Sequence, residues 1–468
     1  MIFSSAQYIL FLAVMLALLA ALPSDRLKKA ALLAGSYLFY ACWDYRFTAL
    51  LAVSTAVNYL VGQRIERSGE RSAQLGWLRA GIVFDLLLLG VFKYCNFFVE
   101  SANGLLGPLH VRLPLAQIVL PVGISFITFE VISYLVDIYR RESRPARNIW
   151  ELGLLVAFFP HLIAGPILKP MQFLPEIEKP IRVRWENIER GFWLFLLGLV
   201  KKVLISDHLA PFVDGVFGRP AAFSSATIWL AVAAYAIQIF CDFSGYSDMA
   251  IGSARALGFE IPANFDMPYI SQNITEFWRR WHISLSRWLR EYLYYPLGGN
   301  RRGKARQYVN LLIVMLLGGL WHGAHWNFVV WGGIHGAGLA VHKLWQDRIG
   351  RRARPGGVPL HAFNWLVTLL FVCLAWLFFR APSMPAALFM LRKMFAAGAG
   401  GAGTVWMQTA TVLSLPAVAL GHLAGLRLRD RFHPRLSTFG GMLLALLVLF
   451  GLLFLAPTAS SPFIYFQF

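Results

Sequence analysis

The amino-acid sequence predicts an all-α integral membrane protein that crosses the bilayer many times. Of its 468 residues, 57% are hydrophobic and 14% are charged, and the mean hydropathy is +0.57. Soluble domains contain about 25% charged residues, so this much apolar surface requires lipid as its solvent. Apolar runs recur along the chain. At about 20 residues per crossing, we expect about 11–13 hydrophobic segments in a single membrane domain, residues 1–468.

The positive net charge is explained by membrane topology. The chain has 43 Lys and Arg residues and 24 Asp and Glu residues, which gives a formal net charge of +19. The basic residues gather in short loops between the apolar runs, which is the positive-inside pattern of a multi-pass protein in an inner or plasma membrane. Nucleic acid is therefore not expected as a partner. The loops placed in the cytoplasm are residues 26–29, 64–79, 140–147, 252–308, 348–354 and 427–435.

The apolar run 149–167 is expected to enter the membrane without crossing it. If every basic loop is cytoplasmic, the number of crossings is consistent only when this run returns to its own side. Pro160, Gly165 and Pro166 interrupt a helix here. Irregular backbone at membrane depth is tolerated only where protein or a water-filled cavity covers it. We therefore expect a re-entrant segment that lines a cavity.

The stretch 271–300, within the loop 252–308, is too polar to cross a membrane and unusually rich in aromatic residues. Asn273 followed by Glu276 predicts a capped helix start, so we expect a helix over 274–295. Its aromatic and basic residues fall on different faces, which predicts an amphipathic helix at the membrane interface, in contact with membrane lipid. A simple surface anchor would produce the same pattern. The aromatic face comprises Phe277, Trp281, Trp288 and Tyr292, and the basic residues are Arg279, Arg280, Arg287 and Arg290.

Histidines in this helix and in the next apolar segment are candidate catalytic residues. His282 lies one turn from Trp278 and Leu285 rather than among the arginines. His322 lies in the apolar stretch 309–336, where an ionisable residue is costly and is by default a functional hypothesis. Nearby glycines predict close helix packing, so the histidine should face protein. A buried imidazole is expected to be neutral, with one ring nitrogen available as a base.

His322 also fits two roles outside acid–base catalysis. It could be a core histidine satisfied by a neighbouring backbone group. A metal site with His325 and His335 is less favoured, because no Cys or Glu stands at ligand spacing beside them. For His325, His335 and His342 a structural role is favoured, and no metal is expected.

Asp242 and Asp248 lie six residues apart in the apolar run 226–251. Carboxylates in such a segment need partners, either to hold neighbouring helices together or to support an active site. Both roles remain open. A G-x-S-x-G motif is absent from the sequence, so a serine nucleophile is not indicated.

Several longer motifs carry a family resemblance. They are PVGISFITFEVISYLVDIYR, FFPHLIAGPI, CDFSGYSDMAIG, PYISQNITEFWRRWHISLSRWLREYLYYPLGGNRRG and LLGGLWHGAHWNFVVWGGIHG, spread over residues 121–336, with LFFRAPS at 377–383. With these motifs the sequence resembles the membrane-bound O-acyltransferase family, in particular its bacterial alginate O-acetyltransferase branch.

The resemblance implies a helical enzyme of the bacterial inner membrane whose essential histidine matches His322. The second motif position, histidine or asparagine in the family, matches His282. Branch members look like relays that pass an acyl group from a cytoplasmic donor to periplasmic acetyltransferase partner proteins, which modify an exported polysaccharide. A branch that D-alanylates teichoic acids has similar motifs. The donor and the polysaccharide therefore stay open.

The expected reaction is acetyl transfer from acetyl-CoA, with no bound cofactor. His322 would act as general base or as transient acyl carrier, and His282 would orient donor or acceptor. Basic residues after the interfacial helix are candidates for binding the phosphates of CoA, although they also fit as topology charges. These are Arg301, Arg302, Lys304 and Arg306. Supporting roles are assigned to Asp242, Asp248, Trp278, Arg279, Trp281 and Asn300.

A transporter that moves polysaccharide or lipid-linked sugar without chemistry is the alternative from another functional class. Transporters also bury charged residues and interrupt helices in the middle of the membrane. The pairing of an intramembrane histidine with an aromatic and arginine-rich helix, and the lack of a detectable inverted repeat, favour the enzyme.

Overall fold

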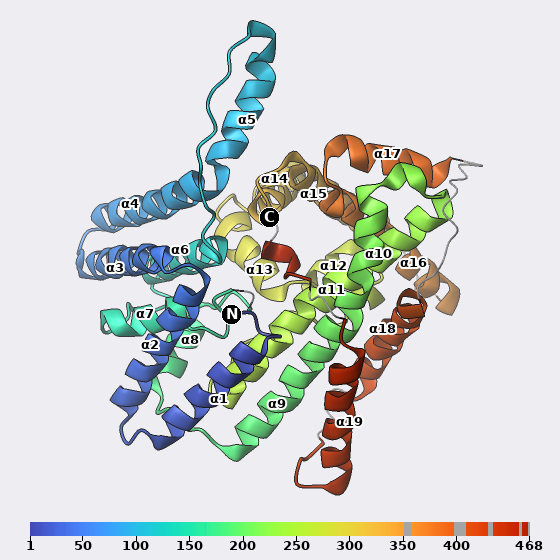
Figure 1. The fold of residues 1–468 in the computed structure, drawn as a ribbon. Coiled ribbons are helices and arrows are strands. Elements are labelled where there is room, and N and C mark those ends of the chain that lie inside the picture. The colour runs from blue at the N-terminus through green and yellow to red at the C-terminus, as the bar shows by residue number, and fades with distance from the viewer. Residues whose placement is uncertain (164, 351–356, 397–408, 429–433, 458–460, 467–468) are drawn as a thin grey trace. The chain divides into compact units, whose positions relative to one another are not determined.

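A computed structural model describes residues 1–163, 165–350, 357–396, 409–428, 434–457 and 461–466. All secondary-structure elements in these ranges are helical, as the sequence predicts (Figure 1). Arg351, Arg352 and Arg354 of one predicted basic loop, and residues 429–433 of another, lie outside the described residues. The helices form two compact units, and α9 and α11 contribute to both.

The first unit consists of Met1–Phe195 and Met249–Pro262. In this unit α3, α4 and α6 lie side by side (Figure 1). Its core contains the rings of Tyr8, Phe39 and Phe159, and the Tyr8 hydroxyl lies 2.9 Å from Ser253 Oγ. The elements are α1 (Ala6–Ala21), α2 (Asp25–Asp44), α3 (Arg46–Arg67), α4 (Arg71–Leu89), the π-helix η1 (Gly90–Tyr94), α5 (Cys95–Leu106), the short 3₁₀-helix η2 (Gly107–Leu109), α6 (Ile124–Arg140), α7 (Ile149–Ala157), α8 (Pro170–Glu178) and most of α9 (Trp185–Leu199).

The run 149–167 is a short helix followed by turns. The side chain of Asn148 caps α7 by accepting a hydrogen bond from the backbone N–H of Glu151. The helix has only nine residues, so it extends about 14 Å along its axis. That is about half of the hydrocarbon core of a bilayer. The chain then turns, and His161 Nε2 lies 3.2 Å from Glu130 Oε2, with both side chains buried.

The second unit consists of Leu196–Asp248 and Ala263–Phe468. Its core is aromatic, and Trp281, Trp331 and Trp376 are among its largest fully buried side chains. After the end of α9 its elements are the π-helix η3 (Val200–Ser206), α10 (Asp207–Gly218), η4 (Pro220–Ala222), α11 (Ser225–Ala256), η5 (Pro268–Ile270), α12 (Ile274–Arg280), α13 (Ile283–Trp288), η6 (Leu289–Tyr294), α14 (Lys304–His322), α15 (Trp326–Trp345), η7 (Gln346–Gly350), α16 (Val358–Arg380), α17 (Met384–Phe395), α18 (Thr409–Leu428), α19 (Phe439–Leu455) and η8 (Ile464–Phe466).

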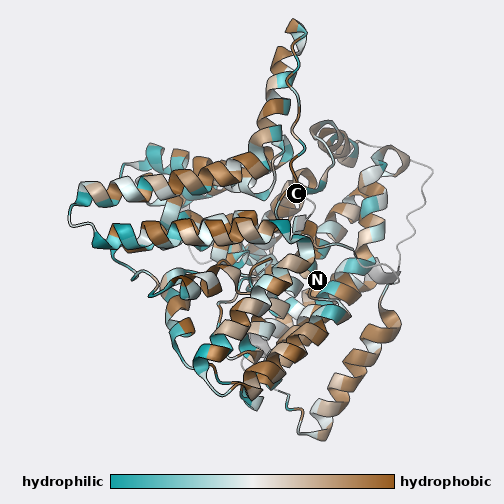
Figure 2. Ribbon diagram, turned by 60° about the vertical axis from the view of Figure 1, so that its left-hand side comes forward, coloured by the Kyte–Doolittle hydropathy of each residue, from teal (hydrophilic) through white to brown (hydrophobic). Residues whose placement is uncertain are grey.

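The outer helix surfaces are apolar. Among the described residues, three helical segments have the length and composition to cross a membrane: Arg71–Leu109, α11 and α16. Large hydrophobic side chains are exposed on many helices, such as Leu10 at 67% and Leu447 at 60%. Figure 2 shows that hydrophobic residues predominate along most of the long helices, with hydrophilic residues near helix ends. Exposed apolar surface on this scale is typical of a protein solvated by lipid.

The stretch 274–295 is divided into α12, α13 and η6, where the sequence predicts one helix. The predicted cap is confirmed, because Asn273 Oδ1 accepts a hydrogen bond from the backbone N–H of Glu276 at 2.8 Å. The break falls at His282, whose φ of 42° lies in the left-handed region, where a helix of L-residues cannot continue. Phe277 and Trp281 are buried in the protein core. Packing against the protein therefore overrides the simple amphipathic pattern.

Two glycines bring the backbones of α14 and α15 into contact. A Cβ atom on Gly332 would lie 2.2 Å from the Met315 carbonyl oxygen, and one on Gly319 would lie 2.1 Å from the Phe328 carbonyl oxygen. A Cβ on the neighbouring Gly333 would meet only a Leu316 methyl group, at 3.4 Å. The sequence prediction of close packing in this region is confirmed at Gly319 and Gly332.

We expect Gly332→Ala to separate α14 from α15 and to destabilise the protein by about 1–3 kcal/mol, the usual cost of overpacking. Gly333→Ala is the matched control, and it should be neutral or slightly stabilising, because alanine favours a helix by about 1 kcal/mol over glycine. Thermal unfolding of both variants in detergent measures the difference. Equal unfolding midpoints would contradict the close contact.

Candidate active site

His322 lies at the carboxyl end of α14, where the extended backbone of Gly323 ends the helix. Its side chain is 4% exposed. Aromatic rings from four segments surround it, with centroids 5.0–5.5 Å from the imidazole. These rings belong to Trp321, Trp331, Phe379 and Tyr465. The imidazole therefore lies in an apolar, largely water-free environment.

His282 is fully buried and lies near His322. The two imidazole centroids are 6.4 Å apart, so a small group placed beside them can contact both rings. The ring of Phe243 on α11 packs edge-on against His282 at 4.7 Å. The left-handed backbone at His282 requires support from surrounding contacts, and such conformations often mark functional sites. We call these two histidines and the rings around them the histidine site.

Asn264 fixes the protonation pattern of His282. Its side-chain oxygen accepts hydrogen bonds from the backbone N–H of Ser284 at 3.2 Å and from Ser284 Oγ at 2.9 Å. A backbone N–H can only donate, so this atom of Asn264 is the oxygen. His282 Nδ1 lies 3.1 Å from the same oxygen and must therefore donate to it. In the neutral ring, Nε2 then carries the lone pair. The backbone carbonyl oxygen of Asn264 accepts a further hydrogen bond, from the backbone N–H of Ile283.

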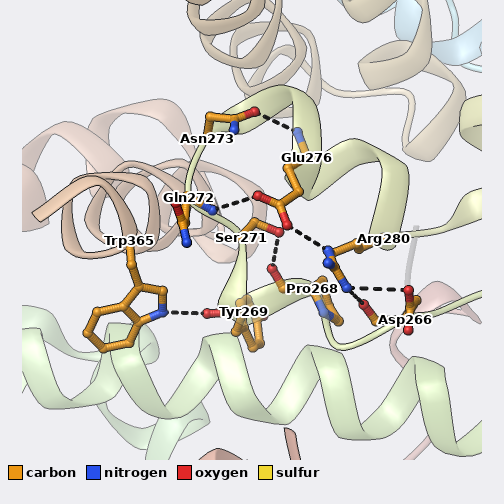
Figure 3. A network of polar contacts seen from close by, with 9 residues as sticks. All are labelled: Asp266, Pro268, Tyr269, Ser271, Gln272, Asn273, Glu276, Arg280 and Trp365. Carbon is orange, nitrogen blue, oxygen red and sulfur yellow. Dashed lines mark hydrogen bonds and ion pairs between the residues drawn. The ribbon is translucent and has the colours of Figure 1, made fainter. Parts of the chain in front are cut away.

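A polar network holds α12 and the segment 266–272 that precedes it (Figure 3). Arg280 Nε donates to Glu276 Oε1 at 3.0 Å, and Arg280 Nη1 donates to the backbone oxygen of Asp266 at 3.1 Å. Glu276 Oε2 accepts from the backbone N–H of Gln272 at 3.0 Å. The indole N–H of Trp365 on α16 donates to the Tyr269 carbonyl at 2.7 Å. These contacts fix the orientation of α12, which ends two residues before His282.

Both tryptophans predicted as supporting residues are buried beside the site. Trp281 stacks on Phe277 at 5.6 Å and contacts Trp376 at 5.0 Å. The indole N–H of Trp278 donates to His335 Nδ1 at 3.3 Å, a contact that fits the structural role predicted for His335. Trp278 also packs against Trp331, which contacts His322. The tryptophans therefore connect α12 to the surroundings of His322.

The two aspartates of α11 form separate ion pairs. Asp242 is fully buried and lies 2.7 Å from Lys202 Nζ, which also lies 2.8 Å from Asp207. Asp248 pairs with Lys201 at 2.5 Å. The lysine partners come from η3, so both carboxylates hold α11 against this neighbouring segment.

The predicted basic residues do not lie near His322. Lys304 begins α14 and His322 ends it. The 18 intervening steps correspond to about 27 Å along the helix. Lys304 pairs with Asp347 at 2.7 Å and lowers the pKa of that carboxyl. The exposed residues around this end of α14 are Asn300, Arg301, Arg302 and Arg306, and Arg279 is exposed on α12.

His325 caps the amino-terminal end of α15. Its Nδ1 accepts a hydrogen bond from the backbone N–H of Asn327 at 3.2 Å and so caps α15. His342 Nδ1 lies 2.8 Å from Thr275 Oγ1, which also fits the structural role predicted for it. Within the described ranges, no group of three or more His, Cys, Asp and Glu side chains is arranged to hold a metal ion.

Three residues of this region were missed by sequence reasoning. Lys202 closely follows the apolar residues 192–200, so the rule that marked the histidines as functional candidates applies to it equally. Asn264 lies in a polar connection, where no local pattern distinguishes it. Tyr465 lies near the carboxyl terminus, and its contact with His322 depends on tertiary structure alone.

Comparisons with known proteins agree on one family. Residues 148–384 match the model of the membrane-bound O-acyltransferase family, and this range includes His282 and His322. The chain is 44% identical over 403 residues to a probable alginate O-acetylase of Azotobacter vinelandii, which covers 85% of this chain and 79% of that protein. It is 38% identical over 392 residues to a peptidoglycan O-acetyltransferase of Helicobacter pylori, with coverages of 78% and 73%. A teichoic acid D-alanyltransferase of Streptococcus thermophilus is 28% identical over 265 residues, with coverages of 53% and 63%.

We expect Asn264→Leu, which is similar in size but lacks the acceptor, to release the tautomer of His282. Loss of one hydrogen bond, about 1 kcal/mol, changes the ratio of the two tautomers by about fivefold. Nitrogen-15 NMR of histidine-labelled protein measures this ratio, with His282→Gln used to assign the signal. Ser247→Ala is the control. It removes the hydroxyl that accepts a hydrogen bond from Asn264 Nδ2, and it should leave the tautomer ratio unchanged. An unchanged ratio in Asn264→Leu would exclude this role for Asn264.

Proposed function

Because the chain belongs to the membrane-bound O-acyltransferase family, we propose that it transfers acetyl groups for the O-acetylation of an exported polysaccharide such as alginate. The chain is an O-acyltransferase, and most of its length matches a probable alginate O-acetylase. The observation that carries the proposal is the buried pairing of His282 and His322 within the matched range. Peptidoglycan is a second candidate acceptor, supported by the Helicobacter pylori relative at lower identity.

The proposed donor is acetyl-CoA, whose thioester is already activated. The protein then has to align donor and acceptor, remove one proton and exclude water. The aromatic rings around His322 support the exclusion of water. With His322 as general base, the acceptor hydroxyl gives its proton to the imidazole while its oxygen attacks the thioester carbonyl. The thiolate leaves and takes up the proton, so that the histidine is regenerated.

His322 as a transient acyl carrier is the alternative form of the same reaction. The imidazole then attacks the thioester carbonyl, and the thiolate leaves with the ring proton. In a second step the acceptor hydroxyl oxygen attacks the acyl group and displaces the imidazole, which takes up the hydroxyl proton. In both forms His282 acts as the orienting group. The hydrogen bond from its Nδ1 to Asn264 makes Nε2 the acceptor nitrogen of the ring, which suits it to receive a hydrogen bond from donor or acceptor.

The topology of the reaction is part of the proposal. We place the protein in the bacterial inner membrane with many crossings, a re-entrant segment at 149–167 and an interfacial position for 274–295. The short length of α7 supports the re-entrant segment. The acetyl group would enter from the cytoplasm and leave to periplasmic acetyltransferase partner proteins. The exposed Arg301 and Arg302 would bind donor phosphates on the cytoplasmic side.

The two alternative functions are less well supported. D-alanyl transfer rests on the Streptococcus thermophilus relative, which is less similar and matches about half of this chain. Transport without chemistry does not account for membership of an acyltransferase family. The decisive assay supplies purified protein and its membrane partners with radiolabelled acetyl-CoA and follows label into alginate. Labelling of peptidoglycan instead would identify peptidoglycan as the acceptor. Labelling only from D-alanyl donors would identify D-alanine as the transferred group.

We expect His322→Gln and His322→Ala to insert normally yet to abolish acetylation. Glutamine keeps similar size and hydrogen bonding but cannot take up a proton at neutral pH. A general acid-base group contributes about 10²–10⁴ in rate, so the loss should far exceed any effect on expression. Polysaccharide acetylation is measured at matched membrane abundance. Near-normal acetylation by the glutamine variant would remove His322 from the mechanism.

We expect the double variant Arg301→Ala, Arg302→Ala to raise the apparent KM for acetyl-CoA and to leave kcat nearly unchanged. The reason is that these exposed residues lie at the far end of α14 from His322 and would contribute binding energy only. Steady-state kinetics with varied acetyl-CoA measure both constants. An unchanged KM would assign the two arginines to topology alone.

A further inference from the structure

A buried cluster of charges holds the carboxyl-terminal segment in the second unit. Lys202 Nζ lies within ion-pair distance of Asp207 and Asp242, and it also donates to the Ser461 carbonyl oxygen at 2.8 Å. The other carboxylate oxygen of Asp242 accepts from the backbone N–H of Ile464 at 2.8 Å. The cluster therefore binds the main chain of the terminal segment at two points. We call Lys202, Asp207 and Asp242 the terminal clamp.

The clamped segment reaches the histidine site. Phe463 is fully buried and packs on Tyr246 of α11 at 4.2 Å. Two residues later, Tyr465 packs on Phe243 at 4.5 Å and on His322 at 5.4 Å. Phe243 also contacts His282. The terminal segment 461–466 thus contributes a side chain to the surroundings of the histidine pair.

Stability alone is a weak reason for such a clamp. Three charged groups in a buried position lose their hydration, and replacing a buried ion pair with apolar residues is often neutral or stabilising. The clamp adds a defined docking position, because its hydrogen bonds specify which backbone atoms of residues 461–466 bind. A purely aromatic contact would allow the segment to slide.

We propose that the terminal clamp is a positioning device for acyl transfer: it holds residues 461–466 so that Tyr465 forms one wall of the histidine site. Lys202 and Asp242 are positioning residues, because they act through the terminal segment. The effect on turnover rests on the proposed acetyl transfer. The docking of the segment is independent of it.

The test uses Asp242→Asn in the full chain, which keeps the size of the side chain and removes its charge. Hydrogen–deuterium exchange of the carboxyl-terminal peptide should become about tenfold faster, as expected when a charge-assisted hydrogen bond is weakened. Peptides from α14 should exchange as in the wild type. In acetylation assays, kcat should fall by about tenfold or more while the KM for acetyl-CoA stays within about twofold.

Asp85→Asn is the matched control. Asp85 is also a buried carboxylate and accepts a hydrogen bond from Asn58 at 2.8 Å, but both of these residues belong to the first unit. Its substitution should leave both the exchange of the terminal peptide and turnover unchanged. If Asp242→Asn fails to fold, Tyr465→Leu in the full chain gives the second test. That variant should insert, bind acetyl-CoA normally and lose turnover.

Normal exchange of the terminal peptide in Asp242→Asn would overturn the clamp. Normal kcat in Tyr465→Leu would overturn the role of the segment at the site. If the wild-type protein transfers no acetyl group at all, the proposed function fails, and the exchange experiment still decides whether the clamp holds the segment.

Discussion

Polar groups buried in this protein must find their partners inside it, because lipid offers none. Two buried polar clusters of the second unit meet this constraint. Asn264 receives hydrogen bonds from His282 and Ser284, and Lys202 balances two carboxylates. The hydrogen bond to Asn264 fixes the position of the His282 ring. The aromatic rings fill the remaining space and keep water away from the imidazoles.

The sequence was sufficient for the properties that depend on local chemistry. The helical class followed from composition, the cap at Asn273 followed from its spacing to Glu276, and the glycine contact between α14 and α15 followed from the glycines in an apolar run. His322 was predicted as a site residue because an ionisable residue in such a run is costly, and its role stays a prediction. Each of these predictions uses only residues that are close in the chain.

Properties that depend on distant residues were not predictable in this way. The helix break at His282 depends on Asn264, 18 residues earlier, which accepts hydrogen bonds from His282 at the break and from Ser284 just after it. The aromatic face of 274–295 packs into protein because α15 and α16 supply facing rings. The contact of Tyr465 with His322 joins residues about 140 positions apart, a separation that no periodic pattern encodes.

The left-handed backbone at His282 restricts which amino acids evolution can place there. Most L-residues are strained in this conformation, whereas glycine accepts it freely and asparagine, aspartate and histidine occur in it several times more often than other residues. Glycine carries no side chain for chemistry. The side chains that this backbone conformation tolerates are therefore few and polar. They include histidine and asparagine, the two residues that the family resemblance allows at this motif position. Part of the selection at position 282 thus acts on the shape of the main chain, before any demand made by the reaction.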